Sequence, residues 1–523
     1  MVFSSVTFIC FFLPIMILGY YILPGKLKNI WLLLGSLFFY AWGEPKYIFI
    51  MLSSIVGNYI FGMLIHFFAL NENTLVINTE LKLAGDNKSG DSGQEINNGP
   101  GGIKVSWGKR ITLVITILFN LGILFYFKYF NLFMETVNQI LHKQISWVEV
   151  ALPIGISFYT FQGMSYVIDV YRTDCKPDRN GTRVEIVQKN PINLALYISM
   201  FPQLIAGPIV RYADIKDYLE QRTVNSEKFI KGAERFIIGL AKKAILANSI
   251  GEAADKIFNS DYAYMDPSVA WLGAICYTLQ IFFDFSGYSD MAIGLGKIFG
   301  FDFLENFDHP YISRSITEFW RRWHISLSSW FRDYLYIPLG GNRRGNVYFN
   351  LIIVFIATGI WHGAAWGFLI WGLWHGVFML IERYFRKSSK AAPFEKIPDI
   401  FKWLYTMLVV VFGWVLFKLE DIGKTFDYIG TMFGAGSRDY TEFSVGYYLD
   451  AKLMVILIIG ILACIPWKDV LVRRGSFNGK GWVKFLSGES GYVLRYMFLI
   501  LLFVLSMIFI INSTYNPFIY FRF

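Results

Sequence analysis

Runs of about 20 apolar residues recur along almost the entire chain, and they constrain the fold more than any other feature. A helix needs roughly 20 such residues to cross a bilayer, and the runs lack the strict alternation of a transmembrane barrel. Charged residues make up 17% of the 523 residues, against about a quarter in soluble domains. The sequence therefore predicts an all-α integral membrane protein with about ten or eleven transmembrane helices.

The apolar runs define the expected membrane spans. They are Val6–Leu23, Asn29–Trp42, Tyr47–Leu70, Ile111–Phe130, Val148–Val170, Ile192–Val210, Ser268–Gly300, Tyr348–Ile381, Phe401–Leu419, Leu449–Pro466 and Gly491–Ile511. No basic residue precedes the first run and no small-residue cleavage site follows it, so we expect a permanent span there and not a signal peptide.

Two stretches depart from this pattern. Asn71–Arg110 is rich in Asn, Gly and Ser and lacks apolar periodicity, as expected of a flexible loop inserted between spans. Glu227–Ile250 has apolar residues on one helical face and basic residues opposite, which predicts a helix lying along the membrane surface. No linker separates a soluble unit, so residues 1–523 are expected to form one polytopic membrane domain.

The net charge of +9 follows from Lys and Arg in expected cytoplasmic loops. Such loops are indicated by Lys26 and Lys28 and by the group Lys468, Arg473, Arg474, Lys480 and Lys484. No nucleic-acid motif accompanies the charge, so no nucleic-acid partner is expected. The cysteines Cys10, Cys175, Cys276 and Cys464 are scattered singly, which favours neither a disulfide framework nor a metal site.

Asn346–Ile381 contains no Asp, Glu, Lys or Arg, yet it holds His362 and His375, each within a Trp-His-Gly tripeptide. Its 36 residues exceed one span of about 20, so we expect a break or two tilted helices. Small residues recur every four positions at Gly359, Gly363 and Gly367. This spacing predicts the close approach of a neighbouring helix.

An ionisable side chain at membrane depth is costly and is therefore a candidate functional residue. Imidazole suits proton transfer because it exchanges a proton near neutral pH. The alternative is a histidine that hydrogen-bonds a helix carbonyl and holds two spans together. Both interpretations remain open for His362 at this point, and the structural one is favoured for His375. The two residues are 13 positions apart, roughly 220° around a helix, so a shared face is not expected.

Ser315–Tyr334 has the pattern of one amphipathic helix with Trp residues suited to an interface. The expected apolar stripe carries Trp320, Trp323, Leu327, Phe331 and Tyr334, with His324 at its edge. Glu318 can pair with Arg322 at i+4. One interpretation is an interfacial helix with an ordinary histidine. The other is that Arg321 and Arg322 neutralise phosphates of a cytosolic carrier.

Asp284 and Asp290 lie in another apolar run, Phe282–Met291. Two acids there could relay protons, or each could pair with a cation or form a buried hydrogen bond. The sequence gives neither residue a catalytic role.

Several motifs together resemble those of the membrane-bound O-acyltransferase family. Within this family the chain resembles the alginate O-acetylation group, and it is also similar to the D-alanyl transfer protein of teichoic acid modification. The matching stretches are Leu152–Phe158, Phe201–Pro208, Asp284–Gly294, Glu318–Gly341 and Gly359–Gly363. They are spread over residues 152–376, about half the chain, and this region is expected to form the catalytic core. The aromatic residue usual before Pro310 is replaced by His309, to which we give no role.

The resemblance implies a ring of transmembrane helices around a thin central region with re-entrant and amphipathic helices, and a tunnel from the cytosolic side to an outward pocket. The family's invariant histidine falls on His362 and its second conserved histidine on His324. The residues expected to bind substrate are Trp361, Trp320, Arg321, Arg322, Gln203 and Asp290.

The function implied is transfer of an acyl group, expected to be acetyl, from acetyl-CoA or another thioester donor. No bound cofactor is expected. The acceptor would be a hydroxyl of an extracellular polysaccharide or a separate extracytoplasmic acetyltransferase of hydrolase fold, and the protein would be a multi-pass protein of the bacterial plasma membrane. The alternatives are D-alanyl transfer to teichoic acid, a transporter using His362 and Asp290 for protons, and a silent scaffold of an export complex.

Overall fold

A computed structural model describes residues 1–86, 107–174, 176–177, 183–205, 207–387, 397–435, 443–467, 470, 489–513 and 515–517. Within these ranges the chain is helical apart from turns and two short strands, β1 (Lys176–Pro177) and β2 (Arg183–Val184), which pair antiparallel. The predicted all-α class is thereby confirmed. The basic group from Lys468 to Lys484 lies outside the described residues.

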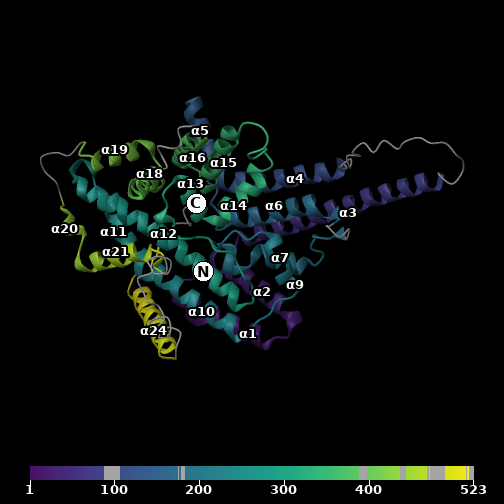
Figure 1. Ribbon diagram of the computed structural model, residues 1–523, viewed down its shortest axis with the longest axis horizontal. Coiled ribbons are helices and arrows are strands. Elements are labelled where there is room, and N and C mark those ends of the chain that lie inside the picture. Colours follow the sequence, from purple (N-terminus) through teal and green to yellow (C-terminus); the bar gives the residue numbers. More distant parts are fainter. Residues whose placement is uncertain are drawn as a thin grey trace.

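The first half of the chain forms helices of very different length (Figure 1). They are α1 (Leu13–Ile22), α2 (Gly25–Gly43), α3 (Ile48–Asp86), α4 (Trp107–Leu124), α5 (Phe130–Leu141), α6 (Ile156–Thr173), α7 (Pro191–Ser199), α8 (Phe201–Leu204), α9 (Tyr212–Glu220), α10 (Ser226–Ala241) and α11 (Asn248–Phe258). Wider π-helical turns stand before α1, between α4 and α5, and between α10 and α11, namely η1 (Phe8–Phe12), η2 (Phe125–Tyr129) and η3 (Lys242–Ala247).

The second half starts after the short turn η4 (Tyr262–Tyr264). Its helices are α12 (Pro267–Ile298), α13 (Ile316–Arg322), α14 (Ile325–Phe331), α15 (Val347–His362), α16 (Trp366–Lys387), α18 (Asp399–Leu419), α19 (Ile422–Met432), α20 (Val445–Tyr448), α21 (Ala451–Ala463) and α24 (Glu489–Asn512). Two short turns, η5 (Pro310–Ile312) and η6 (Arg332–Tyr336), flank α13 and α14.

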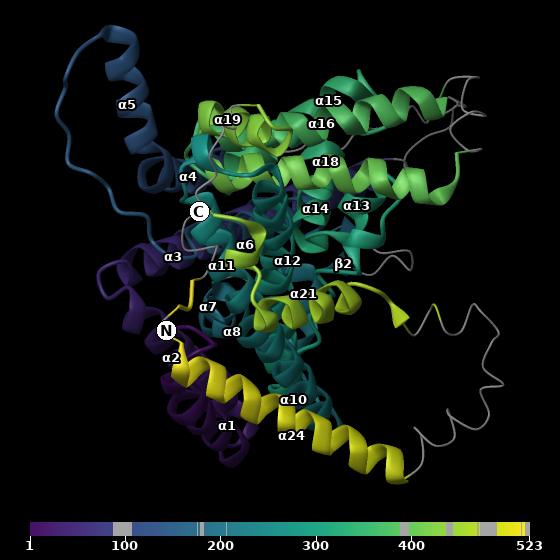
Figure 2. The same ribbon diagram turned by 90° about the vertical axis from the view of Figure 1, so that its left-hand side faces the viewer.

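The helix α12 forms the centre of the molecule (Figure 2). Most of its residues are buried, because α10, α11, α18 and α19 pack around it. By contrast, α24 is apolar yet most of its side chains are exposed, and in Figure 2 it runs along the lower edge. An exposed apolar helix of 24 residues is long enough to face lipid.

Glycines bring α10 and α12 into backbone contact. A Cβ atom on Gly232 would lie 2.6 Å from the carbonyl oxygen of Gly294, and one on Gly239 would lie 2.5 Å from that of Gly287. The buried face of α10 therefore packs along α12. Of the predicted apolar face of Glu227–Ile250, Phe236, Leu240 and Ala244 are buried by protein. The position of this segment along the membrane surface stays a prediction.

The uncharged run Asn346–Ile381 forms two helices, α15 and α16, as its length predicted. They turn at residues 363–365 and pack closely, since a Cβ atom on Gly359 would lie 2.4 Å from the carbonyl oxygen of Phe368. The predicted close approach is confirmed at Gly359, where the partner is the next helix in the chain. Gly363 lies beyond the end of α15, and Gly367 on α16 faces the carbonyl oxygen of Glu420.

Two predicted segments differ from the structure. Ile192–Val210 was expected to span the membrane, but α7 and α8 contain only nine and four residues. The helix is interrupted at Met200, whose ψ of 116° is not helical, and Pro202 stands in the first turn of α8. The predicted loop Asn71–Arg110 is helical at both ends, because α3 continues to Asp86 and α4 begins at Trp107. Residues 87–106 lie outside the described part.

In the described part, five helices have the length and apolar composition of a membrane span. They are Ile48–Asn71, Trp107–Leu141, Pro267–Ile298, Asp399–Leu419 and Gly491–Asn512. Shorter apolar helices occur at Phe8–Ile22, Val347–His362 and Ala451–Ala463. The count of ten or eleven spans stays a prediction.

Candidate active site

His362 is the last residue of α15, and aromatic rings from three helices enclose its buried side chain. Its ring centroid lies 4.9 Å from that of Trp361, 4.8 Å from that of Trp371 on α16 and 5.3 Å from that of Phe417 on α18, all edge-to-face. The helix ends here because Gly363 continues in extended backbone. The imidazole is therefore held in an apolar surrounding at the meeting point of α15, α16 and α18.

His324 stands at a break in the chain. One continuous helix was predicted over Ser315–Tyr334, but α13 ends at Arg322 and α14 begins at Ile325. The φ angle of His324 is 44°, a left-handed conformation that is uncommon for residues other than glycine. The apolar stripe is confirmed at Trp320, Trp323, Leu327 and Phe331, which are buried, whereas Tyr334 is half-buried.

The side-chain oxygen of Asn306 holds His324 in place. This oxygen accepts hydrogen bonds from the backbone N–H of Ser326 at 3.1 Å and from the Ser326 hydroxyl at 2.9 Å, and lies 3.2 Å from His324 Nδ1. The carbonyl of Asn306 also accepts from the N–H of Ile325 at 2.9 Å. An amide oxygen can only accept, so its contact with His324 Nδ1 is a hydrogen bond when Nδ1 carries the proton. Nε2 is then the acceptor nitrogen of this ring.

Trp361 connects the two histidines. Its ring centroid lies 5.9 Å from that of His324 and 4.9 Å from that of His362. Phe158 and Phe161 of α6 pack against the same indole, at 5.6 and 5.9 Å. The structure thus brings together three residues that the sequence singled out: His362, His324 and Trp361.

Trp320 reaches His362 through one further aromatic ring. Its centroid lies 5.8 Å from that of Trp371, which in turn contacts His362. On the other side Trp320 packs edge-to-face against His375 at 5.3 Å. His375 is fully buried among these rings. Within the described residues, neither of its ring nitrogens has a hydrogen-bond partner, so the carbonyl hydrogen bond of the structural interpretation is not observed.

The basic residues of the same segment have different surroundings. Arg321 is exposed. Arg322 forms the predicted i+4 pair with Glu318 at 3.0 Å and a second pair with Asp308 at 2.9 Å. Neither arginine is in contact with the two histidines among the interactions described, so a phosphate-binding role for them stays a prediction.

The remaining predicted site residues lie in other parts of the core. The amide nitrogen of Gln203 donates to the carbonyl of Tyr197. Asp290 is buried between Arg235 and Lys242, at 2.7 Å from each. Asp284 likewise pairs with Lys243, so both acids of this run have the cationic partner that the sequence left as one possibility. The assignment of Gln203 and Asp290 to substrate binding stays a prediction.

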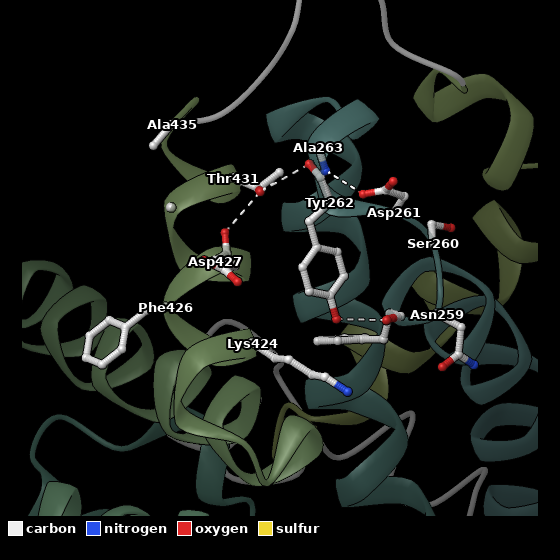
Figure 3. A pocket seen from close by; sticks show the side chains of 12 residues that line it. Asn259, Ser260, Asp261, Tyr262, Ala263, Lys424, Phe426, Asp427, Thr431 and Ala435 are labelled. Carbon is white, nitrogen blue, oxygen red and sulfur yellow. Dashed lines mark hydrogen bonds between the residues drawn. The ribbon is translucent and has the colours of Figure 1, made fainter.

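Cavities are found at the surface of the described part. A polar pocket of about 750 Å³ opens between the end of α11, η4 and α19 (Figure 3). In it the Tyr262 hydroxyl donates to the carbonyl of Phe258, and Thr431 donates to the carbonyl of Tyr262. None of the predicted site residues lines this pocket or the three others located. The tunnel to His362 stays a prediction.

Sequence reasoning missed two residues that contact this site. Asn306 lies in a loop without a helical pattern and carried no signal. Lys128 is buried, and its ammonium group donates to the backbone carbonyl of Trp361 at 2.5 Å. A signal was present here, because Lys128 is the one charged residue in the apolar run Ile111–Phe130.

Comparison with known proteins gives a consistent answer. The family model of the membrane-bound O-acyltransferases matches residues 111–419. The probable alginate O-acetylase AlgI of Pseudomonas putida is 36% identical, with both chains fully covered. The peptidoglycan O-acetyltransferase of Helicobacter pylori is 32% identical, covering 100% of this chain and 98% of its own. The teichoic acid D-alanyltransferase of Bacillus subtilis is 31% identical over 52% of this chain and 69% of its own.

The family model extends over more than half of the chain and includes every residue of the aromatic cluster around His362 and His324. Relatives that are more than 30% identical over their full length are named as O-acetyltransferases. The chain therefore belongs to the membrane-bound O-acyltransferase family.

Proposed function

We propose that the protein transfers an acetyl group from a cytosolic thioester, such as acetyl-CoA, to a hydroxyl group on the outer side of the membrane. The hydroxyl belongs to an extracellular polysaccharide or to an extracytoplasmic acetyltransferase of hydrolase fold that completes the transfer. The observation that carries the proposal is the burial of His362 beside Trp361, whose indole also contacts His324.

In this proposal His362 is the general base. Its imidazole accepts the proton of the acceptor hydroxyl while the oxygen attacks the thioester carbonyl. The C–O bond forms, the C–S bond breaks, and the proton passes from the imidazole to the leaving thiolate. The aromatic rings around His362 exclude water, which disfavours hydrolysis of the thioester. His324, held by Asn306, is placed to orient the donor or acceptor through Nε2.

The acetyl group is favoured over D-alanine by the extent of similarity. Two named O-acetyltransferases align with this chain along its whole length, whereas the D-alanyltransferase aligns with about half of it. A transporter that uses Asp290 for proton movement is disfavoured because that carboxylate is paired with both Arg235 and Lys242.

The test compares His362→Gln with His375→Gln in a deletion strain. Both histidines are buried in the same aromatic cluster, so the two substitutions disturb packing alike. We expect His362→Gln to abolish acetylation, because glutamine cannot accept the proton, and His375→Gln to retain it. Mass spectrometry of cell-envelope polysaccharides measures the acetyl esters, and immunoblotting measures the abundance of each variant. Full acetylation by His362→Gln at normal abundance would refute the role of this residue.

A further inference from the structure

We propose that Lys128 and Tyr129 are positioning residues for His362, because they hold the two backbone carbonyls that immediately precede it. We call this pair the carbonyl clamp. The inference rests on the proposed function, in which His362 transfers a proton.

The contacts of the carbonyl clamp are short and come from a different part of the chain. The ammonium group of Lys128 donates to the carbonyl of Trp361 at 2.5 Å and to the hydroxyl of Ser157 at 3.2 Å. The hydroxyl of Tyr129 donates to the carbonyl of Ile360 at 2.5 Å. Along the chain, Lys128 lies 233 positions from Trp361, and Tyr129 lies 231 positions from Ile360. The clamp thus fixes the end of α15 to η2 and, through Ser157, to α6.

The carbonyls concerned are ones that an α-helix leaves without a partner. The last four carbonyls of a helix have no intrahelical donor, and Ile360 and Trp361 lie in the final turn of α15. In many helices a residue in the left-handed conformation after the last turn provides hydrogen bonds to these carbonyls. Gly363 is extended, so it does not form such a motif. A cation is also favourable at a helix C-terminus because of the helix dipole. Lys128 therefore caps α15 in place of a local motif.

This cap acts directly on His362. The carbonyl of Trp361 belongs to the peptide group that joins Trp361 to His362, so a hydrogen bond to it fixes the plane from which the His362 side chain projects. The same ammonium group lies 5.8 Å from the centroid of the Trp361 ring, which contacts both histidines. A catalytic group displaced by about 1 Å can lose roughly 100-fold in rate.

The π-helical turn η2 explains how two adjacent residues reach one helix end. Neighbouring residues of a regular α-helix point in directions about 100° apart. Here the helix Trp107–Leu141 widens over Phe125–Tyr129, and Tyr129 departs from helical geometry with φ of −113°. Wide turns of this kind occur often at functional sites. A buried charge within a membrane span is costly and is by default functional.

The test uses the purified full-length protein in lipid nanodiscs with acetyl-CoA as the donor. Lys128→Met removes the donor group and keeps the length of the side chain. We expect its kcat to fall about 100-fold with the KM for acetyl-CoA unchanged. Lys128→Arg, which keeps a cationic donor, should restore part of kcat, and Tyr129→Phe should lower kcat less than Lys128→Met.

Lys109→Met is the matched control. Lys109 is a buried lysine of the same helix, placed 5.8 Å from the centroid of Tyr171 and not at the end of α15. If kcat fell equally in Lys109→Met and Lys128→Met, the proposal would be overturned, because both losses would then be explained by disturbed packing of the helix. A rise in KM alone for Lys128→Met would overturn it too, because this would indicate donor binding.

One further measurement separates positioning from general stability. Amide hydrogen exchange of the last turn of α15 should be faster in Lys128→Met than in wild type. If the wild-type protein turns over no thioester, the proposed function fails. The hydrogen-exchange measurement tests the carbonyl clamp independently, because equal exchange in Lys128→Met and wild type would refute the clamp.

Discussion

His324 combines an uncommon backbone conformation with a buried amide that holds it. The side-chain oxygen of Asn306 accepts hydrogen bonds from the backbone N–H and the hydroxyl of Ser326, and it lies within hydrogen-bond distance of His324 Nδ1. Asn306→Ala would leave the backbone N–H of Ser326 and the imidazole without this acceptor, which costs about 1–3 kcal/mol for each unsatisfied buried group. We therefore expect a lower melting temperature and loss of acetylation.

Thermal unfolding in detergent and the acetyl-ester assay check this prediction. Asn306→Asp keeps the acceptor oxygen and should retain more activity than Asn306→Ala. An exposed asparagine with a comparable role, Asn342, accepts hydrogen bonds from Tyr336 and Arg383, and Asn342→Ala should leave acetylation unchanged. The positioning of His324 by Asn306 would be refuted if Asn306→Ala were as active as wild type.

At the scale of elements, the close packing of α10 on α12 depends on glycine. A Cβ atom on Gly239 or Gly294 would lie 2.5 Å from a backbone oxygen of the opposite helix. Because backbone cannot move aside as a flexible side chain can, Gly239→Ala and Gly294→Ala should each destabilise the protein by about 1–3 kcal/mol. Thermal unfolding of the purified variants gives this quantity.

The control for this prediction is Gly122→Ala on α4. No atom lies within 4 Å of a Cβ at that position, and alanine is a better helix former than glycine by about 1 kcal/mol. Gly122→Ala should therefore unfold at the same or a higher temperature than wild type. Equal melting temperatures for Gly122→Ala and Gly239→Ala would contradict the prediction, because they would show that α10 and α12 can move apart without loss of stability.

At the scale of the whole molecule, the distribution of basic residues predicts the orientation in the membrane. The turns at the His362 end of α12, α15, α16 and α18 are residues 259–266, 363–365 and 420–421, and they contain neither Lys nor Arg. Lys256, Lys418 and Lys424 lie on the helices beside these turns. The opposite end carries more basic residues, namely Arg314, Arg343, Arg344, Arg383, Arg386 and Lys402. Cytoplasmic loops are enriched in Lys and Arg, so we expect the His362 end to face outward.

Labelling of single cysteines tests this orientation. Asn259 and Arg343 are exposed at opposite ends, and each is changed to cysteine in a chain whose four own cysteines are replaced. A membrane-impermeant maleimide added to intact cells should label Asn259→Cys and not Arg343→Cys, and permeabilised cells should show labelling of both. The reverse pattern in intact cells would invert the proposed direction of transfer.

Features that depend on local composition could be predicted from the amino-acid sequence alone. Apolar runs predicted a helical membrane protein, and the length of Asn346–Ile381 predicted a break or two tilted helices. The structure shows two helices, with His362 at the end of the first. Burial of a helix face follows from residue spacing along one segment, which is why the stripe beside His324 was also predicted. The motifs from Leu152 to Gly363 were sufficient to identify the family.

Which residues meet at the site depends on contacts between segments that are distant along the chain. Lys128 lies 233 positions from Trp361 and Asn306 lies 18 from His324, and no periodic pattern encodes such pairs. The same holds for the break at His324, where the hydrogen bonds of Asn306 outweigh a continuous amphipathic pattern. A carbonyl at a helix end must find a donor wherever the fold supplies one, and that choice is made by packing between distant segments.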